Sequence, residues 1–131
     1  MTDDAGSKAR VLVVDDDPGI VSFVAMLLES EGFDVDTAVN GVEAMERVVD
    51  APPDLVLLDI AMPRMDGREV ARRLRDHRTP PPVIMMSAGF DARQEAQVHR
   101  AEGFLKKPFS AGDLLECIDG VLRRRRMDSG A

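Results

Sequence analysis

The chain of 131 residues has the length of one ordinary domain, and a domain of this size needs neither a disulfide nor a structural zinc to fold. Its net charge of −7 argues against direct nucleic-acid binding, and the absence of Trp and Tyr removes the rings on which a flavin would stack. The single cysteine, Cys117, can form no internal disulfide and favours a cytoplasmic protein. No apolar run is long enough to suggest a membrane partner.

Short apolar runs alternate with amphipathic stretches along the chain. Continuous apolar runs bounded by turn residues are typical of buried parallel strands, whereas strict alternation is typical of an edge strand. The predicted strands cover residues 11–14, 35–39, 55–58, 83–86 and 104–105, and the second of these alternates.

Each predicted strand is followed by a stretch with helical period. Asp17 is expected to cap the first helix, Asn40 the second and Ser110 the last, and Asp66-Gly67 opens the third. The stretch 92–100 is the least apolar of the predicted helices.

The hydrophobic pattern gives two further expectations, for the buried face of the second helix and for the basic end of the last one. On the second helix Val42, Met45 and Val49 are expected to share the buried face, because they repeat at helical spacing. The basic run Arg123–Arg126 is interpreted as a solvated helix end that complements the helix dipole, with a contact patch for a partner as the alternative.

Five strand–helix repeats predict an α/β fold with a parallel sheet and helices on both faces. We expect a doubly wound, five-stranded sheet of order 2-1-3-4-5, a flavodoxin-like (βα)5 three-layer sandwich. One domain covers residues 9–126, and residues 1–8 and 127–131 are expected to be loose termini.

Polar side chains follow the predicted strands where each strand ends, at the edge where such sheets bind ligands. Asp15 and Asp16 follow the first strand, Asp59 the third, Ser87 the fourth and Lys107 the fifth. Neighbouring carboxylates repel one another unless a cation intervenes, and oxygen donors without His or Cys select Mg²⁺, or alternatively Mn²⁺. With a lysine and a hydroxyl opposite the metal, the set favours phosphoryl transfer onto a carboxylate.

Four segments, residues 11–18, 54–67, 82–88 and 104–109, carry a family resemblance. Together and in this order they resemble the receiver domain of two-component response regulators, a CheY-like domain, over nearly the whole chain.

The resemblance implies a role for each metal-site residue. Asp59 is similar to the phosphoacceptor of the family, and Asp15 and Asp16 to its acidic pair. Asp16 is then expected to bind Mg²⁺ directly and Asp15 through water, and the backbone carbonyl of Ala61 is expected to be a further ligand.

The resemblance also implies a switch. Ser87 stands at the position of the family's switch hydroxyl, Lys107 at that of its lysine, and Phe104 at that of its switch aromatic. The Lys107-Pro108 peptide bond is expected to be cis. Because Phe104 has no hydroxyl to keep in water, we expect its ring to be largely buried even without phosphate, with Ser87 turned away from Asp59.

The implied function is a signalling switch that phosphorylation activates. Such a domain is not an enzyme for other substrates and catalyses only its own phosphorylation and dephosphorylation. Its donor would be a sensor histidine kinase or a phosphotransfer protein, and its output partner would bind the face of the fourth helix, fifth strand and fifth helix. The chain is expected to be a single-domain regulator or the N-terminal piece of a longer one.

Arg100 stands where many relatives of the family have Gly before the fifth strand, so the sequence does not fix the residue at which the fourth helix ends.

Two other functions share parts of this pattern. A small phosphohydrolase of the haloacid-dehalogenase type would use Asp15 as nucleophile, since Asp15-Asp16-Asp17 fits its Asp-x-Asp spacing, although Gly19 replaces the expected hydroxyl residue. A flavodoxin-like binding module would need a phosphate loop after the first strand, where three Asp would repel a cofactor phosphate.

Overall fold

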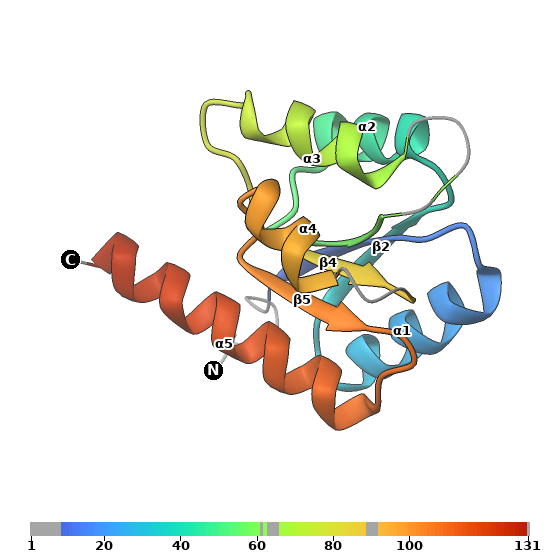
Figure 1. The fold of residues 1–131 in the computed structure, drawn as a ribbon. Helices are drawn as coiled ribbons and strands as arrows, with labels where there is room; N and C mark the ends of the chain where they lie inside the picture. Colours follow the sequence, from blue (N-terminus) through green and yellow to red (C-terminus); the bar gives the residue numbers. More distant parts are fainter. Residues whose placement is uncertain (1–8, 61, 63–65, 89–91, 131) are drawn as a thin grey trace.

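A computed structural model describes residues 9–60, 62, 66–88 and 92–130. Strands and helices alternate along the chain, as Figure 1 shows. The strands are β1 (Arg10–Val14), β2 (Asp34–Ala38), β3 (Leu55–Asp59), β4 (Val83–Ser87) and β5 (Gly103–Lys106). The helices are α1 (Pro18–Ser30), α2 (Gly41–Asp50), α3 (Gly67–Arg75), α4 (Ala92–Val98) and α5 (Ala111–Gly130). The five strands pair in parallel in the order β2-β1-β3-β4-β5, which confirms the predicted fold class and strand order.

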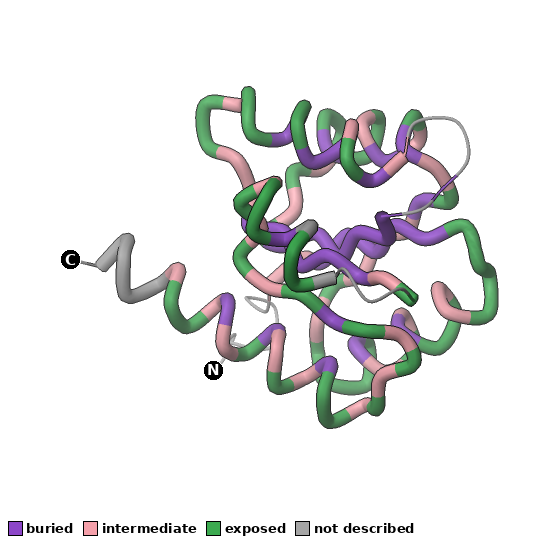
Figure 2. The backbone as a smooth tube through the Cα atoms, in the orientation of Figure 1, coloured by how far each residue is buried: buried purple, intermediate pink, exposed green. Residues whose placement is uncertain are grey.

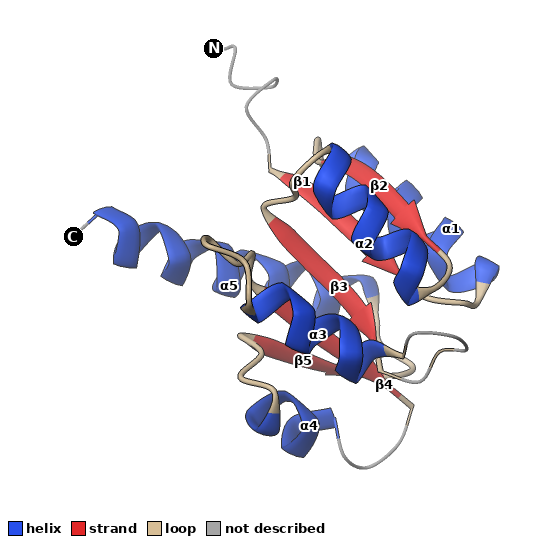
Figure 3. Cartoon of the chain, turned by 90° about the horizontal axis from the view of Figure 1, so that it is seen from above, coloured by secondary structure: helices blue, strands red, loops and turns tan. Residues whose placement is uncertain are grey.

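The sheet forms the middle of three layers, with α1 and α5 on one face and α2, α3 and α4 on the other (Figures 1 and 3). Alternate residues of each strand supply two separate cores, because successive side chains point to opposite faces. Val13 packs with Leu28 and Ile118 in one core, and Val14 packs with Val70 in the other. The central strands are accordingly the most continuously buried part of the backbone (Figure 2).

The predicted helix caps are present. Asn40 Oδ1 accepts a hydrogen bond from the Glu43 amide at 2.8 Å, and Asp17 caps α1 through its side chain. Ser110 and Asp113 each accept a hydrogen bond from the other's backbone amide, at 3.0 and 3.2 Å. Each cap satisfies amide groups that a helix start leaves without a partner, which is why the helices begin where the sequence predicts.

The predicted buried face of α2 is right for Met45, which is half-buried and packs against the core, and wrong for the two valines. Ala44 and Val48 are buried, whereas Val42 is 36% exposed and Val49 is 72% exposed. The two stripes have the same helical spacing, so the period alone does not choose between them. The buried residues of α2 are Gly41, Ala44 and Val48, so two of the three positions that face the core carry small residues, while Val42 and Val49 lie outside.

Helix α5 continues to Gly130, so its backbone is helical through residues 127–130, which the sequence suggested would be loose. Part of the basic run is held by the domain. Arg125 donates to the Pro80 carbonyl at 2.6 Å and lies 3.7 Å from the Glu102 carboxylate, and Arg124 donates to the Glu102 carbonyl at 3.2 Å. These contacts fix α5 beside the starts of β4 and β5 and correct the interpretation of the run as merely solvated.

Helix α4 ends at Val98, two residues earlier than predicted, in a strained turn. The Ala101 amide donates to the Ala96 carbonyl at 2.7 Å and the Arg100 amide to the Gln97 carbonyl at 3.3 Å, while Arg100 has a φ of 58°. This arrangement is a Schellman motif, whose left-handed position is usually glycine. At the end of α1 the corresponding residue is Gly32, with a φ of 93°.

We expect Arg100→Gly to be more stable than Arg100→Ala by about 1 kcal/mol, because a Cβ in the left-handed region costs about that much. At Gln97, inside the same helix, the order should reverse and alanine should be the more stable by a similar amount. Urea unfolding of the four variants measures both differences. Equal stabilities of Arg100→Gly and Arg100→Ala would show that the turn carries no strain.

No helix in the described part of the chain is both long and apolar enough to cross a bilayer.

Candidate functional site

The carboxyl ends of three strands on the same edge of the sheet, β1, β3 and β5, bring the acidic and basic candidates together. Asp15 directly follows β1, Asp59 is the last residue of β3, and Lys107 directly follows β5. Strands β1 and β3 are hydrogen-bonded neighbours, so Asp15 and Asp59 lie side by side, although they are far apart in the sequence. Asp16 follows Asp15 at the rim and is exposed.

The Lys107 ammonium group joins the two buried carboxylates. Its Nζ lies 2.7 Å from Asp15 Oδ2 and 3.4 Å from Asp59 Oδ1. The other oxygen of Asp15 accepts a hydrogen bond from the Asp17 amide at 2.9 Å, so both oxygens of this fully buried side chain have donors. Burial lowers the pKa of Lys107, but the hydrogen bond and charge of Asp15 outweigh it, and the pKa is raised overall.

The end of β3 is held in place by the start of α3. The Gly67 amide donates to the Ile60 carbonyl at 2.8 Å, and a Cβ on Gly67 would lie 2.3 Å from the Asp59 carbonyl oxygen. No side chain fits in that space, which explains the glycine directly after the Asp66 cap. The close approach fixes the backbone that carries Asp59.

The three carboxylates form a group that fits a hard cation. Asp15, Asp16 and Asp59 each offer an oxygen, and these atoms lie within 4.8 Å of one another. Burial, followed by the charge of Asp15, raises the pKa of Asp59 to about 6, against the opposing effect of Lys107. Such crowding of oxygen donors suits Mg²⁺ or Mn²⁺ and disfavours softer metals. Ala61, the fourth predicted ligand, lies outside the described residues.

Ser87 and the Lys107-Pro108 bond lie at the same edge of the sheet, at the carboxyl ends of β4 and β5. Ser87 ends β4 and is half-buried, and its carbonyl accepts a hydrogen bond from the Lys107 amide at 2.8 Å. The Lys107-Pro108 bond is cis, which confirms that prediction. The orientation expected for the Ser87 hydroxyl remains a prediction.

The expectation of a buried Phe104 is wrong. The residue is 36% exposed, and the Arg93 guanidinium carbon lies 5.0 Å from the centroid of its ring. The sequence argument considered only the missing hydroxyl, whereas a cation on α4 gives the exposed ring a favourable partner. Arg93 was missed because it lies in a different element, and only its place at the start of a helix, where a cation is unfavourable, could have drawn attention to it.

Residues 11–119 match the family model described as the response regulator receiver domain. The chain belongs to this family. The receiver domain is a signalling regulator that generally has no enzymatic activity of its own, and the match confirms the resemblance stated from the sequence.

Named relatives and solved structures agree with the assignment. The chain is 37% identical to the transcriptional regulatory protein TrcR of Mycobacterium tuberculosis over 91% of this chain and 47% of the relative. It is 38% identical to the DNA-binding regulator RpaA of Synechocystis, over 88% of this chain and 49% of that protein. The chain therefore spans about half the length of these curated relatives.

Among solved structures, a CheY-like receiver domain protein from Methanospirillum hungatei superposes with a TM-score of 0.85 at 28% identity, covering 92% of this chain and 98% of that one. The chemotaxis response regulator CheY4 of Vibrio cholerae superposes with a TM-score of 0.80 at 32% identity, covering 87% of this chain and 98% of CheY4.

The comparisons support a phosphorylation-activated signalling switch and not the haloacid-dehalogenase alternative. The geometry agrees with this. The proposed nucleophile of the hydrolase, Asp15, is fully buried and both its oxygens already accept hydrogen bonds.

The raised pKa of Asp59 gives the receiver domain a testable pH dependence without metal. Between the unfolded pKa near 3.8 and the folded pKa of about 6, the folded protein binds a proton that the unfolded chain has lost. The contribution of Asp59 to the free energy of unfolding therefore falls as the pH rises from about 4 to about 6 and is level above that. Asp59→Asn should remove this fall.

In urea unfolding with a chelator, we expect Asp59→Asn to exceed the natural protein in stability by about 1–3 kcal/mol at pH 7.5, since each pKa unit corresponds to about 1.4 kcal/mol. The difference should shrink toward pH 4. A difference that does not depend on pH would contradict the assigned cause.

Proposed function

We propose that this receiver domain accepts a phosphoryl group on Asp59 from the phosphohistidine of a histidine kinase or a phosphotransfer protein, with Mg²⁺ bound and in the cytoplasm. The observation that carries the proposal is the position of Asp59. Its carboxylate lies at the end of the central strand, within reach of the acidic pair on one side and of Lys107 on the other.

In this proposal the chain's own groups divide the work. Asp16 and Asp59 hold the metal directly, Asp15 holds it through water, and the Ala61 carbonyl adds a further oxygen. When bound, Mg²⁺ neutralises the carboxylates and the charge on the incoming phosphoryl group. An Asp59 oxygen forms the new bond to phosphorus while the bond from phosphorus to the donor histidine nitrogen breaks. Lys107 supplies a positive charge to the transferred oxygens.

The two hydrogen bonds that Asp15 accepts help to assign the metal ligand and the phosphoacceptor. Lys107 and the Asp17 amide each bind one oxygen of the buried Asp15, which leaves its carboxylate fewer free lone pairs, whereas Asp16 is exposed. This supports Asp16 as the direct ligand. It also supports Asp59 as the acceptor, since Asp59 is the buried carboxylate whose proton affinity its surroundings have raised.

The proposed switch follows from the new phosphoryl group. One of its oxygens would lie away from the metal and need a donor, and we expect the hydroxyl of Ser87, the last residue of β4, to turn toward it. That movement vacates space behind β4, into which the Phe104 ring on the neighbouring strand moves. In the free form the ring is outside, so its inward movement would report activation.

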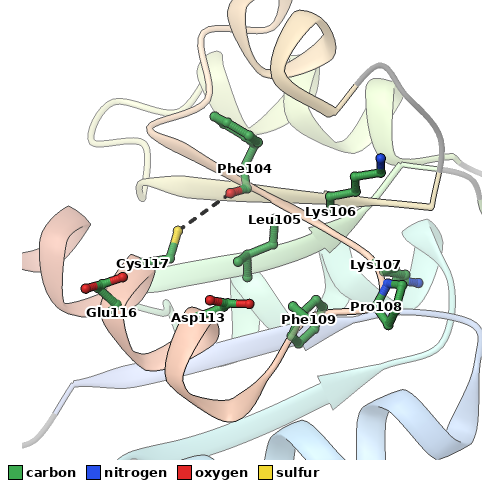
Figure 4. A pocket seen from close by; sticks show the side chains of 9 residues that line it. All are labelled: Phe104, Leu105, Lys106, Lys107, Pro108, Phe109, Asp113, Glu116 and Cys117. Atoms are coloured by element: carbon green, nitrogen blue, oxygen red, sulfur yellow. Dashed lines mark hydrogen bonds between the residues drawn. The ribbon is translucent and has the colours of Figure 1, made fainter.

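The output partner is proposed to bind the face formed by α4, β5 and α5. A groove of about 560 Å³ lies between β5 and α5 on this face (Figure 4). Its lining combines the apolar Leu105 and Phe109 with the acidic Asp113 and Glu116. Burial raises the pKa of Cys117 in the same wall, so this thiol contributes as a packing residue.

Incubation with Mg²⁺ and acetyl phosphate should add one phosphoryl group, which peptide mapping by mass spectrometry should locate on Asp59. Asp59→Asn should abolish the labelling and leave the far-ultraviolet circular dichroism spectrum unchanged. Labelling of that variant on Asp15 would refute the proposal and revive the hydrolase mechanism.

Mg²⁺ should raise the melting temperature of the natural protein, because it binds the folded state alone. Asp16→Ala should remove most of this rise and should be more stable than the natural protein without metal, since one like charge is gone. Asp17→Asn keeps the helix cap and serves as the control, with an unchanged response to Mg²⁺. An undiminished response in Asp16→Ala would exclude it as a ligand.

A further inference from the structure

Phe104 occupies an unusual place for a large apolar side chain on a strand. In Figure 4 it points to the side of β5 opposite Leu105, which faces α5 and is buried in the core. Phe104 remains 36% exposed as a residue, and its ring lies against Arg93 of α4. An apolar ring in this position loses the favourable burial available elsewhere, so a compensating contact is expected.

The compensating contact is the Arg93–Phe104 pair. The guanidinium carbon of Arg93 lies 5.0 Å from the ring centroid, within the range of a cation–π interaction. Arg93 is the second residue of α4, where the positive end of the helix dipole disfavours a cation. The contact with the ring thus gives Arg93 a favourable partner that the helix itself does not supply.

The pair also attaches α4 to the sheet. Among the described side chains of α4, Ala96 is buried, while Val98 is 63% exposed. Contacts made by individual side chains, such as that of Arg93, therefore help to position this short helix. The Arg93–Phe104 pair thus joins the start of α4 to β5 directly.

We propose that Arg93 is a positioning residue that holds the Phe104 ring outward and so opposes the switch. This inference rests on the proposed function, in which the ring moves inward after Asp59 is phosphorylated. The guanidinium group contacts the ring while the ring is outside, and the inward movement breaks the pair. An exposed cation–π contact of ordinary strength shifts the inward-to-outward ratio about two- to fivefold.

The test uses the full chain with ¹³C-labelled phenylalanine rings, without Mg²⁺. The chain has five Phe, and Phe104→Leu identifies the Phe104 signal. A soluble gadolinium chelate then measures how accessible the ring protons are in the natural protein, in Arg93→Gln and in Arg93→Lys. Gln94→Ala changes an exposed neighbour in the same helical turn and is the matched control.

The direction in which the paramagnetic relaxation of the Phe104 ring protons changes decides whether Arg93 holds the ring outward. If Arg93 holds the ring outward, Arg93→Gln lets it move inward and the paramagnetic relaxation of its protons falls. Arg93→Lys, which keeps a cation, should lie between Arg93→Gln and the natural protein, and Gln94→Ala should match the natural protein. If Arg93 merely covers the ring, its removal uncovers the ring and the relaxation rises, which overturns the proposal. No change would overturn it as well.

A second measurement separates this proposal from the one on which it rests. Titration with beryllium fluoride and Mg²⁺, a mimic of the phosphoryl group, should reach half-saturation at a concentration about two- to fivefold lower for Arg93→Gln than for the natural protein. Equal half-saturation for the two proteins would count against the positioning role. If the mimic binds and leaves the Phe104 signal in place in every protein, the proposed switch fails, while the chelate experiment still decides the role of Arg93.

Discussion

One ammonium group between two buried carboxylates is the interaction on which the rest of the site depends. Lys107 lies 2.7 Å from an oxygen of Asp15 and 3.4 Å from one of Asp59. Without this cation, two adjacent strands would end on neighbouring buried negative charges, a costly arrangement in a region of low dielectric constant. With it, the outer strand of the sheet is tied to its centre at the edge where the chemistry is proposed.

This arrangement leaves the charge at the site incompletely balanced. One lysine compensates a group of three carboxylates, and Asp59 retains a pKa of about 6. The fold thus maintains an edge that favours the binding of a cation and, after it, of a phosphoryl group. The folded domain is therefore less stable than it would be with uncharged residues at these strand ends, which is a common feature of functional sites.

Most features that depend on local chemistry could be predicted from the sequence. Apolar runs located the strands, cap residues located the helix starts, and the polar residues after the strands located the site. The buried face of α2 was misassigned because Ala44 and Val42 lie on stripes of equal spacing. The basic run near the end of α5 was misjudged because Arg124 and Arg125 contact Pro80 and Glu102 elsewhere in the chain. The ring of Phe104 was misjudged because it contacts Arg93 on α4. Pairings of this kind leave no periodic signal in a single sequence.

The bond from the Gly67 amide to the Ile60 carbonyl closes the chain on itself directly after β3. The same approach brings the backbone of residue 67 against that of Asp59, because a Cβ on Gly67 would lie 2.3 Å from the Asp59 carbonyl oxygen. Any other residue at position 67 would therefore displace the backbone of the proposed phosphoacceptor, even though its side chain is not one of the charged groups of the site. Position 67 thus constrains the geometry of the site through main-chain packing alone.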